Sequence, residues 1–155
     1  MRKRIAPATS KPQTPELLKW IELDQLATVE ITSEDPAYPV EGALLPGGGS
    51  GWKASQPGVQ TLRLVFDSPQ HIKLIHLEFT EESQSRTQEF VLRWSSGDGQ
   101  PLKEILRQQH NFTPGSREIE DYVVNLHGVV ALELEIVPAI DSKDAHASLT
   151  ELRLA

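Results

Sequence analysis

The chain has 155 residues, and it lacks both cysteine and long apolar runs. Without cysteine it can form no disulfide bond or thiolate nucleophile, so a small secreted scaffold held by bridges is excluded. Only Ile5 and Ala6 separate the basic N-terminal residues from Pro7, which does not fit a signal peptide, and no later run approaches the roughly 20 apolar residues of a membrane span. We therefore expect a cytoplasmic protein that is stabilised by packing alone.

Acidic residues are missing from the first 13 positions, although the formal net charge of the chain is −7. Four of the 15 basic residues lie there, which leaves 11 basic against 22 acidic residues in the remainder. An acidic body repels phosphate groups, so binding to nucleic acids or to anionic membranes is not expected. Membrane insertion is not expected because there is no apolar run long enough for it. We predict a disordered basic arm over residues 1–13 and a single domain over residues 14–155.

Short segments with period-two alternation of apolar and polar residues follow one another along most of the chain. Such alternation is typical of half-buried strands, and the spacing of about ten residues, without long helical periods between, favours an antiparallel two-sheet β-sandwich or jelly roll. The predicted strands cover residues 27–32, 61–67, 75–79, 86–95, 102–112, 121–126, 132–136 and 152–154.

Two other segments are predicted from local signals. Thr14 and Pro15 are a good N-cap and first helical residue, so a short N-terminal helix through about Trp20 is expected. Residues 33–58 show no alternation and are predicted to be a long strandless loop region. Loops that a rigid sandwich holds in place are where binding sites usually lie.

The sequence gives no pattern typical of a catalytic site. The five histidines are dispersed, and the two nearest, His71 and His76, are five residues apart and face opposite sides of a strand. There is no Gly-x-Ser-x-Gly motif, and the glycines at 47–49 and 51 are not followed by the Lys-Ser/Thr of a phosphate-binding loop. We expect a protein that is not an enzyme.

A set of short fragments stands in a characteristic order from residue 32 to residue 152. They are Thr32–Glu34, Tyr38–Pro39, Glu41–Ala43, Gly51–Ala54, Gln60–Phe66, Phe90–Ser95 followed by Gly97–Gly99, and Ala147–Leu152. In this order and spacing the chain resembles the discoidin domain, also called the coagulation-factor type C domain, of the galactose-binding-like superfamily. The resemblance implies an eight-stranded jelly-roll sandwich whose loops at one end bind sugars, lipids or proteins.

The resemblance also raises the question of a structural calcium ion. In many relatives its ligands come from an Asp-Gly turn and from a Glu near the final strand. Glu151 matches the second element, whereas Leu45 stands where the aspartate is expected. A hard cation needs several oxygen ligands, and Glu151 is the single matching side-chain ligand, so no cofactor is expected. A structural calcium ion stays open as the alternative, with backbone carbonyls of the glycine loop as its further ligands.

Sugars are recognised by aromatic faces together with amides, arginines and carboxylates. Residues of these types lie near the glycine loop and on two predicted strands: Glu34, Asp35, Tyr38, Trp52, Lys53, Arg86, Gln88, Arg107, Gln109 and Asn111. For several of them a structural role competes with ligand binding. Trp52 commonly closes the core in the superfamily, and Arg107 with Glu104 fits a surface ion pair.

Two functional hypotheses follow. The first is a non-catalytic module that recognises a carbohydrate or glycan-like ligand through the loops at 34–38 and 46–53. The alternative is an adaptor subunit that binds a protein partner in a cytoplasmic assembly, which the lack of an export signal favours. The sequence leaves the oligomeric state open, because it contains no coiled-coil heptads but an exposed sheet face could still mediate a dimer.

Overall fold

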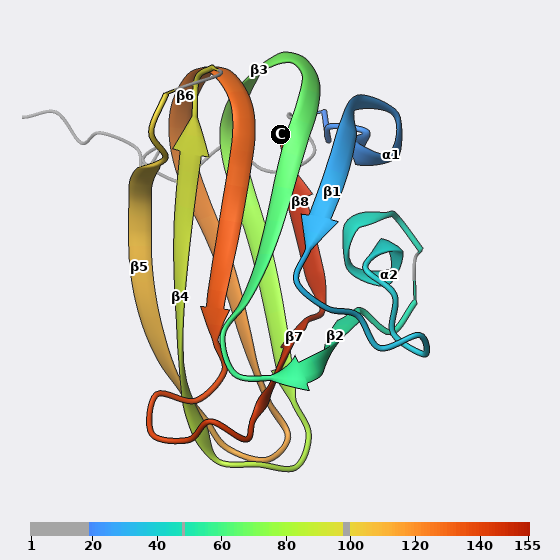
Figure 1. Cartoon of the computed structure of the whole chain (residues 1–155), viewed down its shortest axis with the longest axis vertical. Helices are drawn as coiled ribbons and strands as arrows, with labels where there is room; N and C mark the ends of the chain where they lie inside the picture. Colours follow the sequence, from blue (N-terminus) through green and yellow to red (C-terminus); the bar gives the residue numbers. More distant parts are fainter. Residues whose placement is uncertain (1–18, 48, 98–99) are drawn as a thin grey trace, which may run out of the picture.

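The structure is a computed structural model that describes residues 19–47, 49–97 and 100–155. Its elements are α1 (Leu23–Leu26), β1 (Ala27–Ile31), α2 (Glu41–Leu44), β2 (Trp52–Pro57), β3 (Gln60–Glu81), β4 (Arg86–Ser95), β5 (Lys103–Phe112), β6 (Ser116–Val137), β7 (His146–Leu149) and β8 (Glu151–Leu154). All strand pairs are antiparallel, and the predicted all-β sandwich is confirmed (Figure 1).

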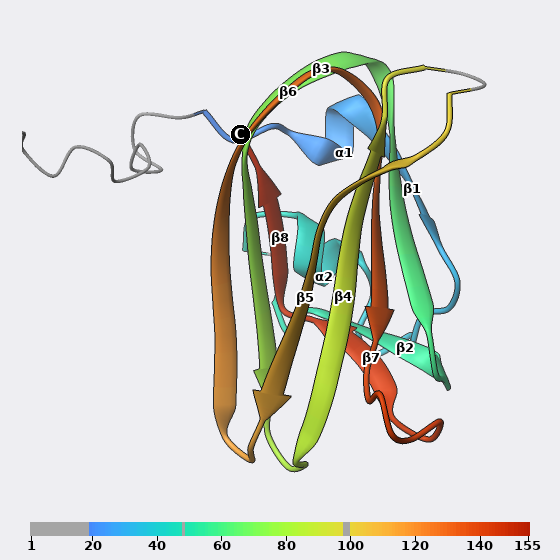
Figure 2. The ribbon, with the colours of Figure 1, turned by 90° about the vertical axis from the view of Figure 1, so that its left-hand side faces the viewer.

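Two strands of 22 residues, β3 and β6, each belong to both layers of the sandwich. In the first layer the order is β1, β3, β6, β4, β5, and in the second layer β3 pairs with β6 on one side and with β8 on the other. Figure 2 shows β3 and β6 arching together over one end of the molecule. Their register shifts between Val65 and Leu74, where the two strands bend from one layer into the other.

These long strands correct the prediction of separate strands at 61–67 and 75–79, and at 121–126 and 132–136. Pro69 follows shortly after the predicted strand at 61–67, and a proline usually ends a strand because it has no N–H for the ladder. It lies between the paired residues Val65 and Gln70, where the ladder is already interrupted, so the missing N–H of Pro69 breaks no backbone pairing. In β6 the corresponding bend contains Gly128 with φ of 70°, a conformation that only glycine adopts at little cost.

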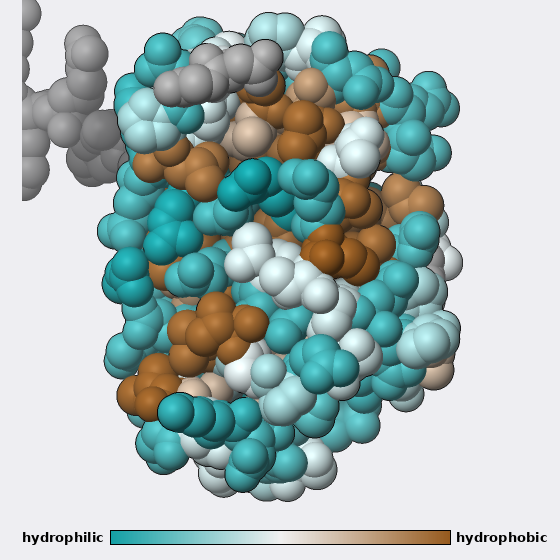
Figure 3. Space-filling view, viewed as in Figure 1, coloured by the Kyte–Doolittle hydropathy of each residue, from teal (hydrophilic) through white to brown (hydrophobic). Residues whose placement is uncertain are grey.

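The core lies between the two layers and is built from the inward residues of the alternating pattern. Each such side chain stabilises the fold by about 1.5–3 kcal/mol when fully removed from water. The largest buried side chains include Trp52, Phe79, Phe90, Phe112, Leu62, Leu77, Leu92, Leu132 and Leu134. On the face shown in Figure 3 the surface is mostly hydrophilic, and apolar side chains form separate patches.

The prediction that residues 33–58 contain no strand is wrong. β2 pairs with β7, with Trp52 opposite Leu149 and Pro57 opposite His146, and α2 forms one further helical turn. β2 could not be predicted from periodicity, because only Trp52 and Ala54 are apolar at alternate positions. The strand then continues with Gln56 and Pro57. Its partner β7, of four residues, was also not predicted.

The predicted N-terminal helix and basic arm fall mainly on residues 1–18, which lie outside the described residues. Lys19 and Trp20 are not helical, and the first described helix begins at Leu23 instead. Each of the two described helices has four residues, and neither is long enough to cross a membrane.

Candidate ligand-binding site

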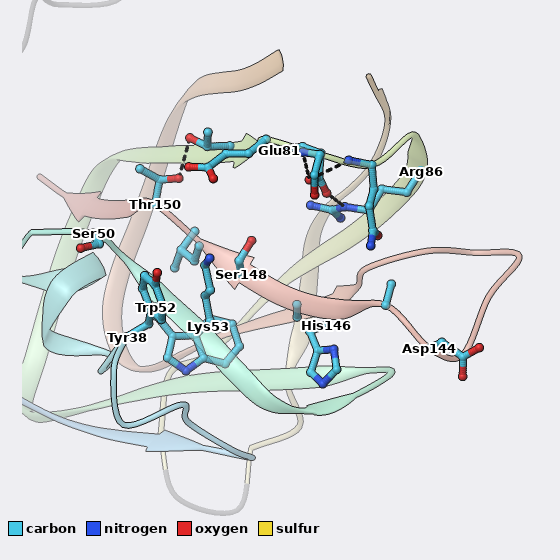
Figure 4. Close-up of a pocket in the computed structure, with 17 residues that line it drawn as sticks. Tyr38, Ser50, Trp52, Lys53, Glu81, Arg86, Asp144, His146, Ser148 and Thr150 are labelled. Atoms are coloured by element: carbon cyan, nitrogen blue, oxygen red, sulfur yellow. Dashed lines mark hydrogen bonds and ion pairs between the residues drawn. The ribbon is translucent and has the colours of Figure 1, made fainter. Parts of the chain in front are cut away.

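An open hollow of about 350 Å³ lies where the β2–β7 pair meets the turn between β3 and β4, at the end of the sandwich away from the arch. Four segments line it: Tyr38, residues 50–53 without Gly51, residues 80–86 without Ser85, and residues 144–150. Figure 4 shows Tyr38 and Lys53 on one side of the hollow, and Glu81 with Arg86 on another.

The loop between β1 and α2 places Tyr38 against Lys53. The backbone N–H of Asp35 donates to Lys53 O at 2.8 Å, and that of Lys53 donates to Tyr38 O at 3.2 Å. These bonds fix the loop to β2 on both sides of the lysine. The ammonium of Lys53 lies 4.1 Å from the centroid of the Tyr38 ring, which is a cation–π contact.

Glu34 and Asp35, two of the sequence-predicted ligand residues, bind the backbone of their own loop. Glu34 Oε1 accepts a hydrogen bond from Val40 N at 2.6 Å, and Asp35 Oδ1 accepts one from Ala37 N at 2.9 Å. Neither side chain lines the hollow. Their structural effect is to hold the turn that carries Tyr38.

Trp52 is completely buried, which agrees with a role in closing the core and not with stacking on a ligand. Its indole N–H donates to Ser33 O at 3.1 Å, and the Ser33 hydroxyl donates to Gln60 Oε1 at 2.6 Å. Trp52 therefore forms the floor of the hollow and ties the β1–α2 loop to the start of β3. Its ring is packed in the core cluster.

Arg86 reaches the hollow from the first residue of β4, but its guanidinium is held by protein groups. Its Nε donates to Glu81 Oε1 at 2.6 Å, and its Nη1 donates to Gln88 Oε1 at 3.0 Å and to Pro138 O at 2.8 Å. The guanidinium also lies 4.6 Å from the centroid of the Phe112 ring. Gln88 is 1% exposed and does not line the hollow.

Glu81 joins this arginine to the turn between β3 and β4. Its second oxygen, Oε2, accepts hydrogen bonds from the N–H groups of Ser83 and Gln84 at 3.0 and 3.2 Å. Burial raises the pKa of the Glu81 carboxyl, but the hydrogen bonds from Arg86 and from the two N–H groups outweigh it and hold the pKa below its usual value. Glu81 is therefore ionised at neutral pH.

The other predicted polar residues lie elsewhere. Arg107 is on the outer face of β5, where it forms an ion pair with Glu89. It forms a second ion pair with Glu104, in which Nη2 of Arg107 lies 3.0 Å from Oε1 of Glu104. Gln109 donates to Glu89 at 3.3 Å, and Asn111 accepts from Thr87 at 2.7 Å. None of the three lines the hollow, so the structure brings together Tyr38, Trp52, Lys53 and Arg86 and separates them from the β5 group.

Sequence reasoning missed most of the polar lining of the hollow. These residues are Thr80, Glu81, Glu82, Ser83, Gln84, Asp144, His146, Ser148 and Thr150, whereas Ser50 lies within the predicted loop at 46–53. They sit at the ends of strands or in the turns beside them, and β7 was not predicted at all. The one available signal was the turn at 81–85, because it separates two predicted strands on the loop side of the sandwich.

The residues present do not fit a calcium ion at the glycine loop. Leu45 offers no oxygen from its side chain, and the Glu151 carboxylate pairs with Arg153. The ligand atoms of Glu151, His76 and Glu78 lie within 4.8 Å of one another. In that cluster Glu78 pairs with Arg117, so both carboxylates are already neutralised by guanidinium groups.

No family model matches the chain, and no curated protein matches it. Solved structures do. A family 32 carbohydrate-binding module of Clostridium perfringens NanJ in complex with galactose matches with a TM-score of 0.61 and 12% identity, over 87% of this chain and 96% of that chain. The module CpGH89CBM32-5 from Clostridium perfringens, in complex with GalNAc-β-1,3-galactose, matches with a TM-score of 0.60 and 16% identity, over 88% and 99%. The chain has the discoidin-like, galactose-binding-like fold.

This discoidin-like fold also occurs as a part of larger proteins. A Ruminococcus gnavus GH29 fucosidase in complex with fucose matches with a TM-score of 0.59 and 8% identity over 83% of this chain, but the match spans only 24% of the fucosidase chain. At these identities the likeness establishes the fold alone.

Proposed function

We propose that this chain is a non-catalytic carbohydrate-binding module, and that it holds a sugar in the hollow beside Tyr38 and Lys53. The observation that carries the proposal is the convergence of an aromatic ring, a lysine, hydroxyls and carboxylates from four segments on one open hollow. The ring of Tyr38 suits the apolar C–H face of a pyranose, and Ser50, Ser148 and Lys53 can serve the sugar hydroxyls.

The size of the hollow fits this ligand class. About 350 Å³ is at the small end of the range for ligand sites, and the open shape leaves one side of a bound sugar in solvent. Because little area is buried, the affinity for a single sugar is expected to be weak, with a Kd of about 0.1–1 mM. The matched modules of NanJ and CpGH89CBM32-5 were solved with galactose and with GalNAc-β-1,3-galactose, which supports the same class of ligand for this chain.

The structural comparisons named above give no support for the alternative of a protein-binding adaptor, since they are carbohydrate-binding modules and an enzyme solved with a sugar. The test is a glycan array followed by NMR titration of the labelled protein with the sugars that bind. We expect the shifted amide signals to come from Tyr38, Lys53 and Ser148.

Two variants decide whether the hollow is the binding surface. Tyr38→Ala removes the aromatic face and should lower the affinity at least fivefold. Arg107→Ala removes a sequence-predicted ligand residue on the outer face of β5 and should leave the affinity unchanged. A loss of binding in Arg107→Ala but not in Tyr38→Ala would place the site on β5 and overturn the assignment.

A further inference from the structure

The two cations that line the hollow are not equivalent. The buried Arg86 is fixed by Glu81, Gln88 and Pro138 O, so its charge is compensated inside the protein. Lys53 is exposed, and within the described part of the chain its ammonium forms a cation–π contact with Tyr38 but no ion pair with a carboxylate. Lys53 is thus the cation that a ligand can reach.

The carboxylates that are not compensated lie on another part of the lining. Glu82 and Asp144 are exposed, and neither forms an ion pair with a described basic side chain. Glu82 follows the compensated Glu81 in the turn after β3, and Figure 4 shows Asp144 on the loop before β7, far across the view from Lys53. The hollow therefore has a positive end at Tyr38 and Lys53, and Asp144 adds a negative charge on a part of the lining away from that end.

We propose that the hollow selects a pyranose that carries one carboxylate, such as a terminal uronic acid, over its neutral equivalent. The sugar ring lies against Tyr38 and its carboxylate faces the Lys53 ammonium. This inference rests on the proposed function, which it deepens. A run of uronic acid residues is disfavoured, because a second carboxylate would meet the uncompensated Glu82 and Asp144 of the lining.

The size of the preference follows from the exposure of Lys53. An ion pair at an exposed site is worth little, and the corresponding gain in affinity is about two- to fivefold. Salt screens such a pair, so the preference should nearly disappear at about 0.5 M NaCl, where the Debye length is only a few ångströms. A neutral sugar has no such dependence on salt.

The experiment compares each acidic sugar with its own methyl ester, which differs only in charge. The probes are galacturonic acid and N-acetylneuraminic acid, which separate uronic from sialic acids as the source of the carboxylate. NMR titration at low salt should give a two- to fivefold lower Kd for at least one free acid than for its ester. In Lys53→Gln this ratio should fall to about one, and in Lys53→Arg it should be retained.

Lys103 provides a matched control, because its ammonium lies 5.7 Å from the centroid of the Trp94 ring, outside the hollow. Lys103→Gln should keep the ratio of the unaltered protein. For the two uncompensated carboxylates of the lining, we expect Glu82→Gln combined with Asp144→Asn to raise the affinity for tetragalacturonate relative to galacturonic acid.

The outcomes separate this inference from the proposed function. If neutral sugars and methyl esters bind as tightly as the free acids, the charge selectivity is overturned while the carbohydrate-binding function stands. The same conclusion follows if Lys53→Gln keeps the preference. If no sugar of any charge shifts the amide signals of the hollow, both proposals are overturned.

Discussion

Nδ1 of His110 on β5 lies 3.8 Å from Oε2 of Glu118 on β6. The two strands are edges of opposite layers, and no backbone pairing joins their described residues. The Glu118 side chain is only 2% exposed, and neither of its oxygens accepts a hydrogen bond from a described donor. A buried carboxyl without a donor is costly when ionised, which gives the open edge of the sandwich a dependence on pH.

This cost leads to the first prediction. Burial, together with the neighbouring negative charge of Glu120, raises the pKa of Glu118 to about 7 from a value of 4.5 without the protein environment. Since the folded state has the higher pKa, the stabilising protonated form is fully present below about pH 4.5. That contribution is lost as the pH rises through about 7.

The change that tests it is Glu118→Gln, which keeps the shape and removes the charge. Relative to the unaltered protein, the free energy of unfolding should gain up to about 3 kcal/mol at pH 8 and little at pH 5. His110 on β5, and Glu120 and Tyr122 on β6, are the titratable groups near this carboxyl. Urea denaturation at several pH values measures the difference. Asp67→Asn, at an exposed carboxylate, is the control, and parallel pH curves for Glu118→Gln and the unaltered protein would contradict the prediction.

The second prediction concerns the two arginines that the sequence offered as ligand residues. Arg86→Met should lower the free energy of unfolding by about 3–5 kcal/mol, because it leaves Glu81 and Gln88 buried without their partner. Arg107→Met should cost much less, since the Arg107 side chain is half-exposed and solvent screens its ion pairs. Chemical denaturation of both variants measures the contrast. Equal losses would mean that Arg86 is not an internal structural residue.

The third prediction separates two glycines that share a positive φ. Gly51 has φ of 83°, and an added Cβ would lie 2.6 Å from Leu149 O; Gly58 has φ of 87° and open space around the same position. Gly58→Ala should cost about 1–2 kcal/mol from backbone strain alone. Gly51→Ala should cost clearly more, because β2 must also move away from the strand that carries Leu149. Thermal unfolding tests the order, and a reversed order would contradict the close approach.

The fourth prediction tests how the loop that carries Tyr38 is held. Gln60 Oε1 accepts hydrogen bonds from the hydroxyls of Thr32 and Ser33, both at 2.6 Å. Gln60→Met keeps the length of the side chain but removes this acceptor, and it should cost about 1–3 kcal/mol. Amide exchange at Asp35 and Tyr38 should quicken more than exchange in β4. Gln70→Met, at a residue that bonds only to nearby Ser68, is the control.

The fold was largely predictable because alternation is a local signal. Apolar residues at alternate positions, such as Leu62 and Leu64 or Leu132 and Leu134, predict a buried strand face whatever the position of the strand in the sheet. Alternation does not report whether a strand continues through a bend, so the single strands β3 and β6 were predicted as pairs of strands. β2 was missed because its apolar alternation ends at Ala54, and β7 was missed because its inward residues are only Ala147 and Leu149.

The candidate site was predictable only in part. Tyr38, Trp52, Lys53 and Arg86 were identified from their residue types and positions, and the structure brings them to one hollow. Arg107 has the same chemistry as Arg86, and it too is followed by polar residues on a predicted strand, so the sequence made it an equally good candidate for ligand binding. Only the three-dimensional arrangement shows that Arg107 lies on the outer face of β5. The local sequence pattern does not report how far two residues on different strands of a sandwich lie from each other.

The sharing of β3 and β6 between both layers has a consequence for folding. Their pairing joins Gln60 with Ile136 and Glu81 with Ser116, so large loops must close before either layer gains its central contacts. Such long-range pairing makes folding slow compared with that of helical domains of similar size. Neither layer can form as an independent subdomain, so we expect a single cut within the arch to unfold the whole domain. A ligand in the hollow should slow the unfolding of both layers together.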